Sequence, residues 1–326
     1  MRKLAVVACS IVLLLLSPVS RGQGDYPQKP IRVIVPFAPG GASDFVARII
    51  GPALSEELKQ PVIIDNKSGA AGNIGMEAAA TSPPDGYTVF LGNVGATAIN
   101  PGIFGNLLRV KPQHDFIAVS KIVDVADVLV VNNDIPAKTA KEFVQYAAEK
   151  KGQLNFASPG SGSQNRLEME FFMKATGISM QHIPYKGGAG PAITDLLGGH
   201  TQTMFTTLPS AMQFIKAGRL RALAVTTAQR VAELPSVPTL VELGYPAMVS
   251  ASWQGVFVPR GTPPPIVEKL FSVTKKVMAN KAIQEKLVVG GAIAATSNSP
   301  EEFAAYLKSE TERWGNLVRE RNIGSD

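Results

Sequence analysis

The feature that most constrains this chain is an alternation of short β-rich runs and amphipathic helical stretches, which occurs twice along its 326 residues. The first unit opens with the apolar run 31–35, and the apolar residues that follow recur at helical spacing from Phe45 to Leu58. Strands that alternate with helices form sheets whose faces the helices cover. The pattern therefore predicts an α/β protein.

The same rhythm continues to the C-terminus. The first unit adds a strand at 62–65, a helix at 73–81 and a strand at 88–91. A second unit begins near Val128, with a helix opened by the capping box Thr139 and Glu142. Its further elements are predicted as strands at 155–157, 181–184, 203–206 and 220–226 and helices at 165–176, 192–197 and 211–217. A strand at 254–258 and C-terminal helices follow, which we expect to return to the first unit.

No glycine- and serine-rich linker separates the two units. The chain is therefore expected to cross between them on short strand-like connections, near 125–130 and again between 224 and 252. Paired short crossings make a hinge. The predicted organisation is lobe 1 at 25–127, lobe 2 at 128–249 and a return to lobe 1 at 250–326, with a ligand cleft between the lobes.

The N-terminus has the layout of a secretory signal peptide. Two basic residues precede an apolar run at 4–16, and small residues follow. The run is shorter than the roughly 20 residues that a spanning helix needs. We therefore expect residues 1–24 to be a leader, cut after Gly22 or Gly24, and the protein to be periplasmic.

The leader also carries the single cysteine and part of the charge. Loss of Cys9 leaves no disulfide, thiolate nucleophile or cysteine metal site. Removing Arg2, Lys3 and Arg21 lowers the formal net charge from +6 to +3. The remaining Lys and Arg residues are scattered among acids, which is not the pattern of a nucleic-acid footprint.

Five loops after predicted strands are rich in glycine and small polar residues. In open α/β sheets, ligands bind at the carboxyl ends of strands, where helix N-termini present unpaired backbone amides. The loops are 36–44, 92–97, 158–165, 185–188 and 206–207. The candidate ligand-binding residues within them are Phe37, Gly40, Gly41, Ser43, Asp44, Gly92, Asn93, Ala96, Thr97, Ser158, Ser163, Gln164, Asn165, Tyr185, Thr206 and Thr207. Their recurrence on both units predicts a shared cleft.

Each candidate has a structural alternative. Glycine-rich turns also form for conformational reasons alone. Asp44 suits a helix cap better than a contact with an anion, and Lys186 suits a solvated loop. Trp253 fits either the cleft or packing at the hinge.

The sequence offers little for catalysis. His114, His182 and His200 are too widely spaced for a local metal motif, and no nucleophile elbow, zinc-protease helix or phosphate loop occurs. We therefore expect no enzyme activity, no metal and no cofactor.

Several stretches resemble the Bug family, the periplasmic receptors of tripartite tricarboxylate transporters. They include YPQKPIRVIVPFAPGGASD, NIGMEAAATSPPDGYTVFLGN, HIPYKGGAGPAITDLLGGH and SPEEFAAYLKSE, and they occur in the family's order over nearly the whole chain. The resemblance implies a type II periplasmic-binding-protein fold that closes on a carboxylate. It also implies that 37–44, 92–97, 158–165 and the pair Thr206 and Thr207 contribute amides and hydroxyls.

The chain departs from the family pattern at three places: Ala96-Thr97, Arg166-Leu167 and Phe205-Thr206-Thr207. Where the family often has Phe-Asp-Asn, the third stretch has Thr206 in place of the aspartate. Because this removes a negative charge, it predicts less preference for ligands that bear an ammonium group. Arg166, if it points into the cleft, would clamp a second carboxylate; it lies on the outer face of its helix in the alternative.

The favoured function is capture of a small organic carboxylate and its delivery, by a monomer, to a tripartite tricarboxylate-type membrane permease. A ligand sensor that signals to a membrane kinase would use the same closure. An enzyme on this scaffold is the remaining alternative.

Overall fold

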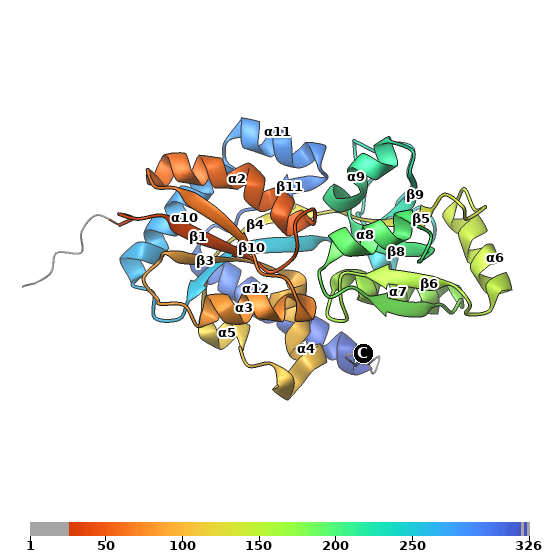
Figure 1. Ribbon diagram of the computed structural model, residues 1–326, viewed down its shortest axis with the longest axis horizontal. Helices are drawn as coiled ribbons and strands as arrows, with labels where there is room; N and C mark the ends of the chain where they lie inside the picture. The colour runs from red at the N-terminus through yellow and green to blue at the C-terminus, as the bar shows by residue number, and fades with distance from the viewer. Residues whose placement is uncertain (1–25, 321–322, 325–326) are drawn as a thin grey trace, which may run out of the picture.

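The computed structural model describes residues 26–320 and 323–324, and the predicted leader at 1–24 lies outside them. This part of the chain forms two β-sheets with helices on their faces, and the sheets belong to two lobes that lie side by side (Figure 1). Among the described residues, no helix combines the length and apolar character needed to cross a bilayer. The predicted two-lobed α/β architecture is confirmed.

The sheet of lobe 1 has six strands in the order β11-β4-β10-β3-β1-β2. Strands β1, β2 and β3 are parallel, whereas β10 runs antiparallel to both β3 and β4. The strands are β1 (Ile31–Val35), β2 (Val62–Asn66), β3 (Thr88–Asn93), β4 (Phe116–Val125), β10 (Ser252–Pro259) and β11 (Ala292–Ala294).

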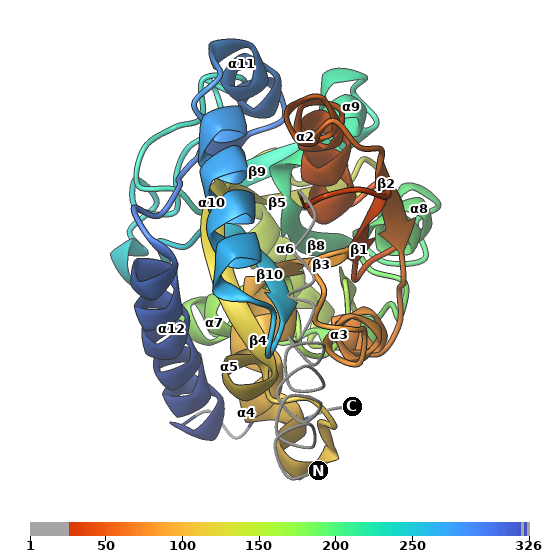
Figure 2. The same cartoon turned by 90° about the vertical axis from the view of Figure 1, so that its left-hand side faces the viewer.

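Helices bury both faces of this sheet (Figure 2). One face is covered by α2 (Ala42–Leu58), α10 (Pro264–Met278) and α11 (Lys281–Val289). The other is covered by α3 (Asn73–Ala80), α4 (Asn100–Phe104), α5 (Pro112–Asp115) and α12 (Pro300–Glu320). Short helical turns at Ala70–Gly72, Gly95–Ile99 and Gly105–Leu107 connect them. The C-terminal helices α10, α11 and α12 thus pack on the sheet of lobe 1.

The sheet of lobe 2 has five strands in the order β7-β6-β8-β5-β9. They are β5 (Asp127–Asn132), β6 (Asn155–Ser158), β7 (Gln181–Pro184), β8 (Thr203–Thr207) and β9 (Leu220–Val225). Helices α6 (Ala140–Lys150) and α7 (Gln164–Thr176) and the turn Pro246–Met248 cover one face, and α8 (Ala189–Leu197) and α9 (Leu208–Lys216) cover the other.

The chain crosses between the two lobes twice. In lobe 1, the antiparallel strand β10 has just returned from lobe 2; in lobe 2, the antiparallel strand β5 has just arrived from lobe 1. One residue, Ala126, separates β4 from β5. On the return path, the Ser250 N–H donates to the Thr226 carbonyl over 3.1 Å, which ties that path to the end of β9. The lobe boundaries at 127 and 249 remain predictions.

The sequence did not identify β4 as a strand. Its run contains Ser120, Lys121 and Asp124, which interrupt the apolar pattern. In the fold, Lys121 pairs with Asp124 at 2.8 Å, and the Ser120 hydroxyl lies 3.2 Å from that of Ser297. Partners supplied by the folded chain therefore make these polar residues compatible with a buried strand.

Candidate functional site

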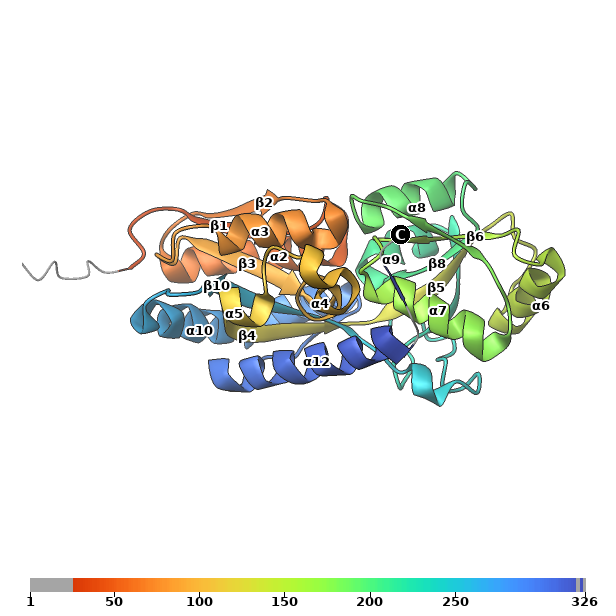
Figure 3. The ribbon, with the colours of Figure 1, turned by 90° about the horizontal axis from the view of Figure 1, so that it is seen from below.

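A pocket lies between the lobes, at the carboxyl ends of the parallel strands. Figure 3 shows the two lobes from below. Its cavity volume is about 40 Å³. The loops after β1, β3 and β6, the start of α8, the end of β8 and the strand β10 line it. The lining residues are Phe37, Gly41, Ala42, Ser43, Asn93, Val94, Gly95, Pro159, Ser163, Gln164, Asn165, Ala189, Thr207, Ser252 and Gln254.

Half of the predicted site residues line this pocket. They are Phe37, Gly41, Ser43, Asn93, Ser163, Gln164, Asn165 and Thr207. The other half lie next to it without lining it: Gly40, Asp44, Gly92, Ala96, Thr97, Ser158, Tyr185 and Thr206. Whether any of them binds a ligand remains a proposal.

The N-terminus of α2 points its backbone amides at the pocket. Gly41 is the N-cap, and no side chain accepts a hydrogen bond from the first turn there. Ala42 and Ser43, which begin the helix, line the pocket. Free amides and the helix dipole give this end of a helix a positive partial charge. The arrangement suits an anion.

Asp44 supports the loop before α2. Its carboxylate accepts a hydrogen bond from the Gly40 N–H over 3.1 Å and pairs with Arg48 at 2.9 Å. Asn66 in β2 donates to the Phe37 carbonyl over 2.9 Å. Asp44 is therefore in the first turn of the helix, three residues after the N-cap Gly41, and its charge is compensated by Arg48.

The loop after β3 divides into exposed and supporting residues. The Asn93 side chain accepts from the Ala96 N–H over 3.0 Å, and the Thr97 hydroxyl donates to the Asn93 carbonyl over 2.7 Å. A side chain at Gly92 would collide with Phe257. Ala96, Thr97 and Gly92 thus shape the turn that presents Asn93 to the pocket.

In lobe 2, the loop after β6 leads into α7. The Ser163 hydroxyl accepts from the Arg166 N–H over 3.3 Å and caps this helix. Ser158 lies behind the loop, where its hydroxyl contacts the Gly160 N–H at 3.2 Å and His182 Nε2 at 2.7 Å. Ser163 therefore caps a helix beside the pocket, whereas Ser158 supports the loop from behind.

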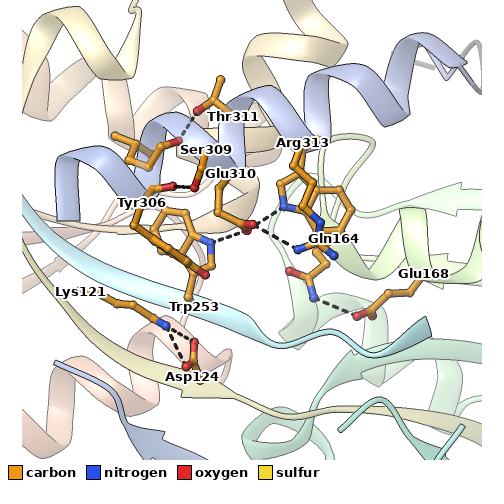
Figure 4. A network of polar contacts seen from close by, with 12 residues as sticks. Lys121, Asp124, Gln164, Glu168, Trp253, Tyr306, Ser309, Glu310, Thr311 and Arg313 are labelled. Atoms are coloured by element: carbon orange, nitrogen blue, oxygen red, sulfur yellow. Dashed lines mark hydrogen bonds and ion pairs between the residues drawn. The ribbon is translucent and has the colours of Figure 1, made fainter. Parts of the chain in front are cut away.

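Gln164 and Asn165, the first residues of α7, are anchored to two carboxyls at the hinge. Gln164 Nε2 lies 3.2 Å from Asp127 Oδ2 and 2.9 Å from Glu168 Oε1. Asn165 Nδ2 lies 2.7 Å from Asp127 Oδ1 and 3.0 Å from Glu168 Oε2. Ser250, on the return crossing, also donates to Glu168. Figure 4 shows the contact from Gln164 to Glu168.

The two hinge carboxyls perturb each other. Burial and the neighbouring Glu168 raise the pKa of Asp127 well above its ordinary value of 3.8. Burial raises the pKa of Glu168 as well, although the donors of Gln164 and Ser250 oppose the shift. The pair therefore keeps a proton at pH values where isolated carboxyls would have lost it.

The sequence pattern did not indicate that Ser252 and Gln254 belong to the site. Both lie on β10, a strand predicted only as part of the sheet core. A serine and a glutamine flank Trp253 in an otherwise apolar strand, but polar residues in a strand indicate a site only once their neighbours are known. Alternation along a strand puts these two polar residues on the face opposite the tryptophan.

Three open questions from the sequence are settled by contacts away from the pocket. Arg166 donates to the Gly324 carbonyl over 2.7 Å and lies 3.7 Å from Glu170, so the inward clamp on a carboxylate is not formed. Trp253 is 1% exposed, and its Nε1–H donates to Glu310 over 2.9 Å beneath α12, as Figure 4 shows. Lys186 is exposed.

The three remaining second-lobe candidates differ. The Tyr185 hydroxyl donates to Asp195 over 2.7 Å and does not reach the pocket. The Thr207 hydroxyl lies 2.7 Å from that of Ser210 and lines the pocket, whereas Thr206 is buried within β8.

The lobes touch each other around the pocket mainly through backbone. The Ala38 N–H of lobe 1 donates to the Gly187 carbonyl of lobe 2 over 3.0 Å. A side chain at Gly162 would overlap the Asn100 side chain, and one at Gly188 would lie 3.0 Å from Phe37. These contacts hold the lobes close together.

The pocket lining carries no charged residue among the described positions. In the same part of the chain, no group of three or more His, Cys, Asp or Glu side chains is placed to hold a metal ion. The lining can therefore bind a ligand through hydrogen bonds from amides and hydroxyls and through the dipole of α2.

Comparison with known proteins gives a consistent picture. The sequence profile of the TctC family, described as "Tripartite tricarboxylate transporter family receptor", matches residues 46–323. Protein BugT of Bordetella pertussis (strain Tohama I) is 36% identical over 321 residues, 98% of this chain and 97% of its own.

Two solved structures superpose over nearly the whole chain. The periplasmic binding protein BugD has a TM-score of 0.87 and 32% identity, covering 91% of this chain and 99% of its own. R. palustris Rpa4515 with adipate has a TM-score of 0.88 and 33% identity, covering 92% and 99%. The predicted periplasmic-binding-protein fold is thereby confirmed.

Proposed function

Because the chain belongs to the tripartite tricarboxylate transporter receptor family, we propose that it captures a small carboxylate-bearing organic anion in the periplasm and delivers it to a tripartite-type membrane permease. The family consists of solute-binding receptors, and a relative of the same fold was solved with adipate, a dicarboxylate. The residues of this chain give the proposal its physical basis.

The observation that carries the proposal is the N-terminus of α2 in an uncharged pocket. Gly41, Ala42 and Ser43 present the first turn of a 17-residue helix to the pocket without a side-chain cap. A ligand carboxylate would accept hydrogen bonds from these amides, which are charge-assisted and therefore stronger than neutral ones. No neighbouring acid in the described lining opposes its charge.

Closure of the lobes supplies the signal for delivery. The pocket takes residues from both lobes, and the lobes meet through the Ala38 to Gly187 hydrogen bond. A ligand that contacts both sides stabilises the closed form by the free energy of those added contacts. The permease would then recognise surfaces that lie together only in the closed form.

A thermal-shift screen of the purified protein against mono-, di- and tricarboxylates tests the proposal. A ligand at about 100 times its Kd adds roughly 2.7 kcal/mol of stability, which raises the Tm measurably. We expect at least one carboxylate to do so and matched sugars and polyamines not to. No shift with any acid, together with no co-purified acid in native mass spectrometry, would contradict carboxylate binding.

A further inference from the structure

Two glutamines in the cleft have side-chain atoms without a hydrogen-bond partner among the described residues. Gln254 is 1% exposed, and both its amide nitrogen and its amide oxygen lack a partner. Gln164 is 3% exposed, and its Oε1 lacks one. Both side chains line the cleft. Burying an amide without hydrogen bonds is costly, so each atom calls for a partner from a bound molecule.

The hinge carboxyls determine which polar atom of the Gln164 side chain is available to a ligand. Its NH₂ group lies within hydrogen-bond distance of both Asp127 and Glu168, and carboxylate oxygens accept from that group. The remaining polar atom is Oε1, which can only accept a hydrogen bond. Gln164 therefore requires a donor from the ligand.

Gln254 stands beside the proposed carboxylate site. It lies on β10, in register with Asn93 of β3, and Ala42 and Ser43 of α2 line the same pocket. The side chain of the preceding Trp253 packs on the opposite face of the sheet under α12. Gln254 is thereby presented on the α2 face, and it needs both a donor and an acceptor.

A ligand made only of carboxylate and hydrocarbon would leave this need unmet. A carboxylate oxygen accepts and so satisfies Gln254 Nε2, but it cannot donate to either amide oxygen. A hydroxyl group can do both. An ammonium group also donates, but no charged residue of the described lining would offset its desolvation.

We propose that the cleft is built for a hydroxy acid, whose carboxylate binds the N-terminus of α2 and whose hydroxyl hydrogen-bonds the amides of Gln164 and Gln254. This inference rests on the carboxylate-binding function proposed above and adds a ligand class to it. The hydroxyl donates its one proton to Gln164 Oε1 and accepts from Gln254 Nε2.

Titration calorimetry with matched ligand pairs tests the assignment on the wild-type protein. The pairs are propionate and lactate, succinate and malate, and glutarate and 2-hydroxyglutarate. In the pair of suitable length, we expect the hydroxylated member to bind about ten- to a hundredfold more tightly, because the other member leaves buried amides unpaired. Aspartate, which carries an ammonium in place of the hydroxyl of malate, and succinamate, which carries an amide in place of one carboxylate of succinate, serve as further probes.

The variant Gln254→Met locates the effect. Methionine keeps the length of the side chain and removes both hydrogen-bonding atoms. We expect the preference for the hydroxylated member over the unsubstituted acid to shrink at least about fivefold. Gln213→Met, on the exposed face of α9, is the matched control and should leave both affinities unchanged.

The outcomes separate the two proposals. Binding of some acids with equal affinity within every pair would overturn the hydroxy-acid assignment alone. So would tighter binding of succinamate or aspartate than of malate, or an undiminished preference in Gln254→Met. No binding by any acid would overturn the proposed function itself. The ligand pairs test the assignment on the wild-type protein even if the variant does not fold.

Discussion

The two lobes line one cleft with different chemistry. Lobe 1 offers the backbone of the first turn of α2 and of the turn at Val94 and Gly95, together with the amide of Gln254 on β10. Lobe 2 offers the amides of Gln164 and Asn165, which the buried pair of hinge carboxyls holds in place. Backbone amides can recognise any carboxylate, whereas anchored side chains fix where particular donors and acceptors lie. We infer that the first turn of α2 selects the class of ligand, whereas the amides of Gln164 in lobe 2 and Gln254 in lobe 1 select its substituents.

The largest expected effect comes from blocking contact between the lobes. In Gly162→Ala, the added methyl group overlaps the side chain of Asn100, which is itself buried and bonded to the Ala71 carbonyl over 3.0 Å. Overpacking costs about 1–3 kcal/mol, or about 5- to 150-fold in Kd if only the closed form suffers. Calorimetry with the best carboxylate measures it.

Gly315→Ala, in α12, is the matched control for that variant. A Cβ there meets only the end of the Arg319 side chain, at 3.5 Å, and lies outside the cleft. Its affinity should equal that of the wild type. If Gly162→Ala also bound normally, the contact between Gly162 and Asn100 would not belong to the ligand-bound form.

The anchoring of lobe 2 predicts a loss of stability. Asn165→Ala removes a donor from both Asp127 and Glu168, which stay buried. The free energy of unfolding should fall by about 1–3 kcal/mol, the usual cost of leaving buried acceptors unpaired. Urea denaturation measures it. A stability equal to that of the wild type would mean that the carboxyls do not depend on this amide.

The hinge carboxyls also predict a dependence on pH. A raised pKa of Asp127 in the folded state means that the folded form binds its proton more tightly than the unfolded chain does. Its contribution to stability is therefore present below the ordinary pKa of 3.8 and declines as pH rises through the raised value. Asp127→Asn imitates the protonated carboxyl and should remove this decline.

Unfolding free energies of the wild type and Asp127→Asn between pH 4 and 8 check this sign. The difference between them should shift in favour of the variant as pH rises. Parallel curves over the whole range would contradict a shared proton at the hinge.

The smallest effect is expected for a side chain of lobe 1. Ser43→Ala keeps the backbone amide of the first turn of α2, so the affinity for the carboxylate should change by less than about threefold. Titration calorimetry on Ser43→Ala and Asn165→Ala, measured side by side, compares the two helix starts. A larger loss in Ser43→Ala would show that the first turn of α2 also recognises the ligand through a side chain.

The sequence predicted the outline of this site better than its details. The glycine-rich loops could be found because the strand-helix rhythm locates the carboxyl ends of the strands. Gln254 could not, because a polar residue inside an apolar strand is a site signal only when its neighbours are known. Arg166 could not be oriented, since its partner Gly324 is distant in sequence. The pairing of Asp127 with Glu168 likewise depends on how α7 packs at the hinge.

Titration calorimetry of the best carboxylate and of its primary carboxamide tests directly whether the cleft recognises a carboxylate. The amides at the N-terminus of α2 only donate hydrogen bonds, and the helix dipole favours a negative charge there. We predict that the carboxylate binds at least about tenfold more tightly than the carboxamide, the ratio that corresponds to 1.4 kcal/mol. Equal affinity for the two would contradict carboxylate recognition by this cleft.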